Sequence, residues 1–278
     1  MGRGSLNGKV VAITGAGSGI GRALAQLAAA RGARLALSDW NKAGLEETVA
    51  QLGDGVDVMS TQVDVADRAA VAAWADEVVQ YFGQVNMIVN NAGVSVAGDF
   101  LEMSYEDFDW IVGINFMGVV NGTKEFLPHL IASGDGYLVN ISSLFGLISM
   151  PGQSAYNATK YAVRGFTEAI REEMLIAKHP VGVTCVHPGG IKTGISRNGR
   201  KTTSQDADAL DRFFDEKLAR MTPEKAAKII LDGALAHRPR VLVGLDAHLI
   251  HQFGRIAGAR YQDVFAAASK RMMPTPRS

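Results

Sequence analysis

The chain of 278 residues contains a single cysteine, and its charge is balanced. The lone thiol, Cys185, excludes an internal disulfide, and its apolar neighbours predict a buried, inert side chain in a cytoplasmic protein. The 28 basic and 28 acidic residues cancel, so nothing favours binding to nucleic acid or to an anionic membrane. Long apolar runs are also missing. Polar residues and a proline interrupt the uncharged stretch 136–159, and we expect no membrane span.

Seven short apolar runs alternate with amphipathic stretches along the chain. They are Lys9–Thr14, Arg34–Ser38, Val56–Gln62, Met87–Asn90, Gly136–Ile141, Val181–His187 and Arg240–Val243. This alternation predicts one α/β domain over 1–278, a Rossmann-type doubly wound parallel sheet of about seven strands with helices on both faces. Ligands of such sheets bind beyond the carboxyl ends of the strands, so those ends are where functional residues are expected.

A glycine-rich turn directly follows the first of these runs. Gly15, Gly19 and Gly21 stand between the run and a stretch of strong helix formers, Ala23 to Ala30. Glycines in such a turn let the backbone approach a pyrophosphate, and the free amides and dipole of the helix N-terminus favour an anion. The segment therefore predicts dinucleotide binding, and the alternative is a glycine loop with only a packing role.

A tyrosine and a lysine, Tyr156 and Lys160, are spaced to share one face of a helix. An ammonium about 4 Å from a phenol favours the phenolate by about 4 kcal/mol at an effective dielectric near 20. That energy lowers the phenol pKa by about three units, enough for proton transfer near neutral pH. The alternative is an incidental pair on an exposed helix.

Together the motifs resemble those of the short-chain dehydrogenases/reductases, from about Leu6 to Gly190. The motifs are Thr14-Gly15-x-x-x-Gly19-Ile20-Gly21, Asn90-Asn91-Ala92-Gly93, Asn115, Ser143, Tyr156-x-x-x-Lys160 and Pro188-Gly189. The resemblance implies that Tyr156 is the general acid/base and that Lys160 binds the nicotinamide ribose and lowers the tyrosine pKa. It also implies that Ser143 orients the substrate oxygen and that Asn115 supports a water-mediated proton relay from a bent helix.

The cofactor is expected to be NAD rather than NADP. Asp39, about twenty residues beyond the glycine turn, can accept hydrogen bonds from the ribose hydroxyls and would repel a 2′-phosphate. Trp40 follows it where an arginine would favour NADP, and Lys42 is the one nearby cation that argues otherwise. The cofactor contacts implied by the resemblance are Gly15, Ser18, Gly19, Ile20, Asp39, Asp64, Val65, Asn91, Ala92, Gly93, Tyr156, Lys160, Pro188, Gly189, Ile191 and Thr193. No metal site is expected, since Asp246, His248 and His251 lack a further ligand.

The resulting hypothesis is an NAD-dependent oxidoreductase that interconverts a secondary alcohol and a ketone, with an apolar small molecule as substrate. Substrate contacts are expected from Ser143, Phe145, Gln153 and Tyr156, and from a lid over about 191–222 that includes Phe213 and Phe214. A C-terminal extension covers about 244–278. The alternatives are an NADPH-dependent ketone reductase and a non-catalytic dinucleotide-binding protein. By resemblance the protein forms a homodimer or homotetramer.

Overall fold

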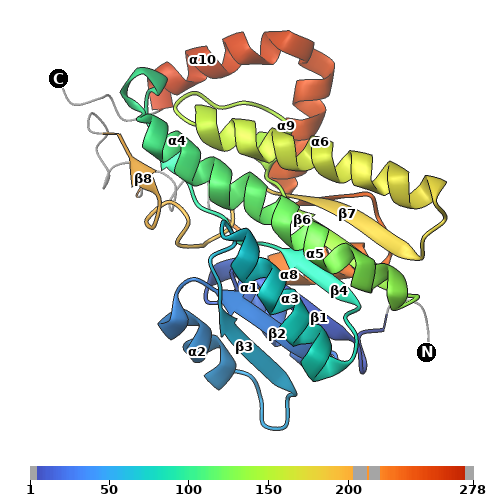
Figure 1. Ribbon diagram of the computed structural model, residues 1–278. Helices are drawn as coiled ribbons and strands as arrows, with labels where there is room; N and C mark the ends of the chain where they lie inside the picture. Colours follow the sequence, from blue (N-terminus) through green and yellow to red (C-terminus); the bar gives the residue numbers. More distant parts are fainter. Residues whose placement is uncertain (1–4, 203–211, 213–219, 273–278) are drawn as a thin grey trace.

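The structure, a computed structural model, describes residues 5–202, 212 and 220–272, and it contains the expected parallel sheet (Figure 1). The strands are β1 Val10–Thr14, β2 Arg34–Asp39, β3 Val58–Gln62, β4 Met87–Asn90, β6 Gly136–Ile141, β7 Val181–Pro188 and β9 Arg240–Val243. Their order is β3-β2-β1-β4-β6-β7-β9, and all neighbours pair in parallel. The seven predicted strands are confirmed within two residues at their ends. The winding reverses beside β1, so a crevice for a ligand is expected between β1 and β4.

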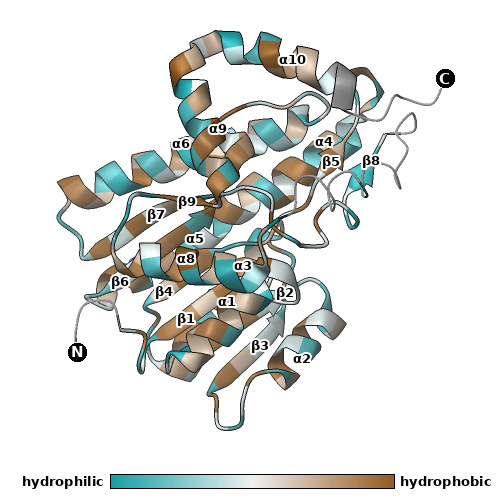
Figure 2. Ribbon diagram, turned by 180° about the vertical axis from the view of Figure 1, so that it is seen from behind, coloured by the Kyte–Doolittle hydropathy of each residue, from teal (hydrophilic) through white to brown (hydrophobic). Residues whose placement is uncertain are grey.

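Helices cover both faces of the sheet. Figure 1 shows α3, α5 and α6 in front of it, and the reverse view in Figure 2 shows α1 and α8 on the other side. The helices of eight residues or more are α1 Gly19–Ala30, α2 Lys42–Ala50, α3 Arg68–Phe82, α4 Tyr105–Val112, α5 Gly118–Ala132, α6 Ser154–Ile176, α8 Pro223–Leu235, α9 Leu245–Ala257 and α10 Tyr261–Met272. This arrangement confirms the predicted fold class.

The core is split by the sheet into two layers. Alternate residues of β1 serve the two sides: Val11 and Ile13 pack towards α1 and α8, whereas Val10 and Ala12 pack towards α3 and α5. On the second side, Trp74 and Phe126 meet edge to face with their ring centroids 4.9 Å apart. Because side chains are buried on both faces, the strands read as continuous apolar runs rather than as alternating ones.

Capping residues explain where several helices begin. Ser104 accepts a hydrogen bond from the Asp107 amide at the start of α4, and Thr222 accepts one from Lys225 before Pro223 opens α8. Both starts are predicted by the sequence. The helical stretch from Tyr105 to Ala132 contains a five-residue π-helix, Gly113–Met117, between α4 and α5.

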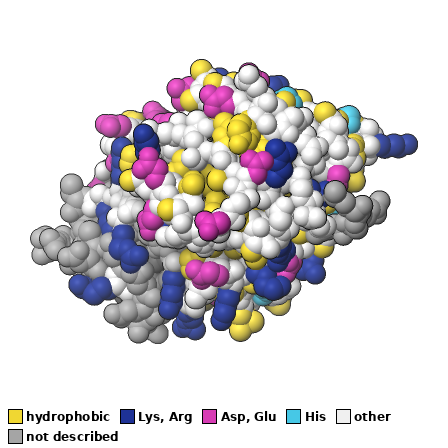
Figure 3. Space-filling model, turned by 90° about the horizontal axis from the view of Figure 1, so that it is seen from below, with side chains coloured by type: hydrophobic (Ala, Val, Ile, Leu, Met, Phe, Trp, Pro, Cys, Tyr) yellow, Lys and Arg dark blue, Asp and Glu magenta, His cyan; other side chains and the backbone are white. Residues whose placement is uncertain are grey.

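Charged side chains of both signs lie on the surface of the molecule. Figure 3 shows acidic and basic side chains interspersed over much of one face, in keeping with the zero net charge. Among the described residues, no helix is both long enough and apolar enough to cross a membrane. In the segment 191–222, which the sequence predicts to be a lid, Ile191 forms a bridge with Met221, and β8 (Arg200–Lys201) pairs with β5 (Val96–Ala97). The predicted lid residues Phe213 and Phe214 lie outside the described residues.

Candidate active site

The glycine turn is packed so closely that side chains are excluded from it. A Cβ on Gly21 would lie 2.0 Å from the carbonyl oxygen of Gly15, and a Cβ on Gly15 would lie 2.8 Å from Cα of Ala92. Ser18 precedes α1, but its side chain caps none of the first-turn amides. These amides therefore remain available to an anion at the positive end of the helix dipole.

Asp39 ends β2 and its carboxylate faces the glycine turn. One oxygen accepts the Gly17 amide and the other accepts the Asn41 amide, each at 2.8 Å. Cations near this carboxylate have acidic partners: Arg22 binds Glu47 at 2.8 Å, and Lys42 lies 3.8 Å from Glu46. The surroundings thus offer a carboxylate to a ribose, while the nearby cations are already paired with carboxylates.

Asn91 joins the carboxyl ends of β1 and β4. Its side-chain amide donates to the carbonyl oxygens of Thr14 at 3.0 Å and Gly15 at 3.2 Å. The backbone amides of Asn91 and Ala92 both donate to the Thr14 hydroxyl at 3.0 Å. The predicted cofactor residues Gly15, Asn91 and Ala92 are therefore brought together, with the Asn91 side chain engaged in holding the crevice.

Ser143, Tyr156 and Lys160 converge from two adjacent segments. Ser143 follows β6, and its hydroxyl accepts the Phe145 amide at 3.1 Å and hydrogen-bonds to Tyr156. Tyr156 and Lys160 lie in the first two turns of α6. The Lys160 ammonium is 5.6 Å from the centroid of the tyrosine ring and donates to the carbonyl oxygen of Ile141 at 3.1 Å.

Burial controls the charges of this pair in the ligand-free chain. Burial raises the pKa of Tyr156, and the hydrogen bond with Ser143 opposes that shift only in part. Burial also lowers the pKa of Lys160 to about 8. In the ligand-free chain the pKa of Tyr156 thus lies above its ordinary value, and the prediction that Lys160 lowers it stays a prediction. The ammonium is turned towards Ile141, and removal from water disfavours the charged form of both groups.

Asn115 lies in the π-helix and is fully buried. Its amide group clasps the backbone of Val94, accepting the N–H at 2.8 Å and donating to the C=O at 2.9 Å. A second bond reaches the Thr159 hydroxyl at 3.3 Å. The side chain thus connects the segment after β4 with α6, and π-helical turns are frequent at functional sites. The predicted water relay stays a prediction.

Two further polar residues hydrogen-bond to the backbone of Ser143 and Lys160. His187 places Nδ1 2.9 Å from the carbonyl oxygen of Ser143, and burial lowers the pKa of its imidazole to about 4. The ring is neutral at pH 7, and because a carbonyl can only accept, Nδ1 carries the proton. Ser142 donates to the carbonyl oxygen of Lys160 at 2.8 Å. Both contacts are with backbone carbonyl oxygens and give these residues a structural role.

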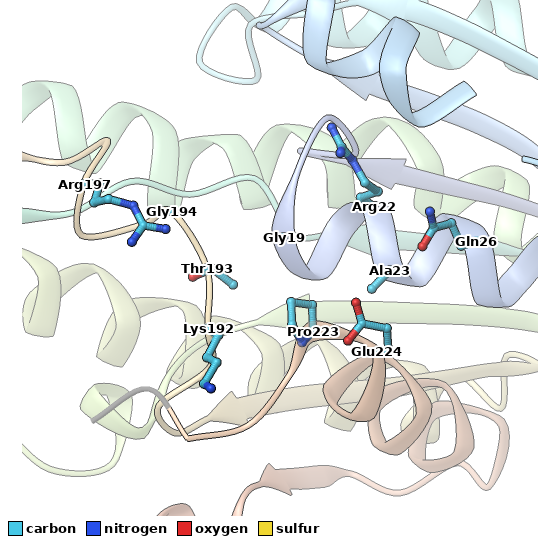
Figure 4. A pocket seen from close by; sticks show the side chains of 10 residues that line it. All are labelled: Gly19, Arg22, Ala23, Gln26, Lys192, Thr193, Gly194, Arg197, Pro223 and Glu224. Carbon is cyan, nitrogen blue, oxygen red and sulfur yellow. The ribbon is translucent and has the colours of Figure 1, made fainter. Parts of the chain in front are cut away.

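The structure has two hollows near these segments, and neither is lined by Ser143, Tyr156 or Lys160. The first, about 220 Å³, lies between the glycine turn, the segment after β7 and the start of α8, with Gly19 facing Thr193 (Figure 4). The second, about 660 Å³, is a groove between the loop after β6, the first turns of α6 and α10, and Met150, Tyr161 and Phe265 line it. Phe145 meets Tyr156 edge-on, with ring centroids 6.3 Å apart.

The C-terminal extension contributes contacts that sequence reasoning missed. The sequence pattern points to Asp246 only as a metal ligand, but in the structure its carboxylate accepts the Gly190 amide. His248 Nδ1 lies 2.8 Å from the carbonyl oxygen of Gly244. No group of three potential metal ligands occurs among the residues that the structure describes. Tyr261 accepts the Ser149 amide at 2.9 Å. No local sequence signal marks the bonds of Asp246 and Tyr261, because they depend on where the extension packs.

Fold and site define an oxidoreductase that uses a nicotinamide dinucleotide. The chain belongs to the short-chain dehydrogenase family, whose family model matches residues 9–204. It is 53% identical over 272 residues to a protein of Mycobacterium tuberculosis named "Putative oxidoreductase SadH", and the match covers 97% of this chain and 98% of SadH.

Other similar proteins agree with this assignment. The C alpha-dehydrogenase of Sphingobium is 33% identical over 257 residues, or 86% of this chain and 84% of that protein. A short-chain dehydrogenase/reductase from Burkholderia phymatum, solved in complex with NAD, superimposes with a TM-score of 0.85 at 29% identity. That match covers 99% of this chain and 98% of the other.

Proposed function

We propose that the protein is an NAD-dependent oxidoreductase that interconverts a secondary alcohol and a ketone, with Tyr156 as the general acid/base. The convergence of Ser143, Tyr156 and Lys160 beside the glycine turn carries this proposal. A hydroxyl, a phenol and an ammonium in one buried cluster suit proton transfer to and from a substrate oxygen. A protein that only binds a dinucleotide has no need of this set.

The residues around the crevice fit a nicotinamide dinucleotide. Uncapped amides at the start of α1 suit the pyrophosphate, and Asp39 suits the hydroxyls of the adenosine ribose. The similar Burkholderia structure contains NAD, which supports the same cofactor here. When bound, the cofactor supplies the hydride acceptor or donor.

Four side chains orient the substrate and transfer its proton in the proposed reaction. Ser143 donates a hydrogen bond to the substrate oxygen and so orients it beside the phenol. Tyr156 takes the hydroxyl proton during alcohol oxidation and returns it during ketone reduction. Lys160 binds the ribose hydroxyls and, when its ammonium turns towards the phenol, favours the phenolate. Asn115 keeps the segment after β4 against α6, where these groups meet.

Apolar side chains around the phenol support a substrate of low polarity. Val94 packs in the same cluster as Tyr156, and Phe145 presents its ring to the tyrosine edge. Leu144, next to Ser143, is a core residue that packs against Ile148 and α9. Phe145 and Gln153 remain our proposed substrate contacts.

Turnover of a graded panel tests the proposed function. Secondary alcohols and ketones, from small aliphatic to steroid-sized, are incubated with NAD(H) or NADP(H), and the nicotinamide absorbance is followed. We expect turnover with NAD and an alcohol of low polarity. Binding of NAD without turnover of any member of the panel would count against the oxidoreductase and favour a binding role.

Cofactor preference depends on Asp39. Asp39→Ala should weaken NAD about tenfold, because a hydrogen-bonded charged acceptor is lost, and should reduce the discrimination against NADP. The measurement is the ratio of kcat/KM with NAD to that with NADP. Glu46→Ala removes an exposed carboxylate of α2 and should leave the ratio unchanged. An unchanged ratio in Asp39→Ala would contradict the role of Asp39.

A further inference from the structure

One hydrogen bond ties the C-terminal extension to the loop after β7. Asp246, in the first turn of α9, accepts the backbone amide of Gly190 at 2.7 Å. Gly190 lies between Gly189 and Ile191, both of which are proposed cofactor contacts. The bond therefore acts on the backbone that faces the nicotinamide end of the crevice.

Two glycines make room for this carboxylate. A Cβ on Gly189 would lie 2.2 Å from one oxygen of Asp246, and a Cβ on Gly244 would lie 2.3 Å from the other. Gly244 also has a φ of +109°, which side-chain-bearing residues rarely adopt. The turn from β9 into α9 and the loop after β7 are thus both shaped around Asp246.

Backbone bonds hold the rest of the same loop. The Gly189 amide donates to the carbonyl oxygen of Val243 at 2.9 Å, and the Lys192 amide donates to Met221 at 2.9 Å. Within this framework Asp246 supplies a charged acceptor, and a charge-assisted hydrogen bond is about twice as strong as a neutral one. Loss of the carboxylate would free the Gly190 amide and leave a space beside Gly189.

We propose that Asp246 is a positioning residue for the nicotinamide end of the cofactor. The inference rests on the proposed function and adds a role for the extension. By fixing Gly190, Asp246 holds the loop that leads to Ile191 and Thr193, and Thr193 lies against Gly19 of the glycine turn. Asp246 acts through this loop and does not touch the reacting atoms.

A second residue of the C-terminal extension, Tyr261, provides a control for the Asp246 variants. Tyr261 binds the amide of Ser149, in the loop that follows Ser143, whereas Asp246 binds the loop after β7. Tyr261→Phe removes one hydroxyl and keeps the ring packed beside Phe265. Asp246 variants should therefore act on the cofactor, and Tyr261→Phe should act on the substrate.

Calorimetric titration of the full chain with NAD tests the assignment. We expect the Kd of Asp246→Ala for NAD to rise about tenfold. With saturating NAD, its KM for the best alcohol of the panel should stay within about twofold. Tyr261→Phe should leave the Kd for NAD within about twofold and should raise the KM for the alcohol. An NAD affinity of Asp246→Ala within about twofold of the wild type overturns the proposal, as does equal weakening of NAD by Tyr261→Phe.

Asp246→Asn keeps the size of the side chain and an acceptor oxygen, and should weaken NAD about threefold. If Asp246→Ala does not fold, Asp246→Asn carries the test, and wild-type NAD affinity in that variant overturns the proposal. A wild-type chain that binds no nicotinamide dinucleotide overturns both the proposed function and this inference. Normal binding and turnover with unaffected Asp246 variants overturn the inference alone.

Discussion

Tyr156→Phe should reduce turnover by about 10²–10⁴-fold, the range that general acid/base catalysis contributes. The substitution removes the hydroxyl that hydrogen-bonds to Ser143 but leaves the ring that packs edge-on against Phe145. No proton can then pass to or from the substrate oxygen at this position. The measurement is kcat with the best alcohol of the panel, together with the Kd for NAD, which should stay close to that of the wild type.

Tyr105→Phe is the matched control for this variant. Tyr105 is 91% exposed at the start of α4, and loss of its hydroxyl should leave kcat unchanged. Turnover of Tyr156→Phe near that of the wild type would remove Tyr156 from the acid/base role. A fall in both kcat and NAD binding would instead indicate damage to the crevice.

Lys160→Met should lower turnover about a hundredfold. A charge near 5.6 Å, the distance from the ammonium to the tyrosine ring, is worth about 3 kcal/mol at an effective dielectric near 20. In alcohol oxidation, the rate rises with pH as the phenol loses its proton. Without the lysine charge, this rise should move to higher pH. The test is the pH profile of kcat, and a profile identical to that of the wild type would contradict coupling between Tyr156 and Lys160.

The Tm of Lys160→Met shows whether its lower turnover results from unfolding. Burial lowers the pKa of Lys160 from 10.5 to about 8. The unfolded chain therefore binds more protons than the folded one between these values, and stability rises with pH across that window. Below about pH 8 the buried charge destabilises the fold, by about 3 kcal/mol. Lys160→Met should thus have a Tm at pH 7 no lower than that of the wild type, and a much lower Tm would contradict this account.

The strands could be predicted because their signals are local. The inner strands of the sheet are short apolar runs, and burial on both faces makes those runs visible without knowledge of their neighbours, whereas the edge strand β3 is more polar and partly exposed. The glycine turn is equally local, since strand, turn and helix follow one another within Val10–Ala30. The spacing of Tyr156 and Lys160 placed both on one helix for the same reason.

The electrostatics of the site could not be predicted in the same way. Spacing alone brought Lys160 to the face of Tyr156, but the pKa values of the two groups depend on how much water the completed fold removes. The carbonyl oxygen of Ile141, which receives the lysine ammonium, comes from a different strand. A pairwise estimate from the sequence leaves out burial, which raises the pKa of Tyr156 in the ligand-free chain.

The sequence by itself determined the fold class and the glycine turn, because short-range patterns encode both, and the family resemblance supplied the candidate catalytic set. Only the tertiary structure decided what the C-terminal extension does. Asp246 reaches Gly190 across 56 positions, and Tyr261 reaches Ser149 across 112. Contacts over such separations leave no periodicity or motif in the chain, since they exist only once the sheet is complete and α9 has packed against it.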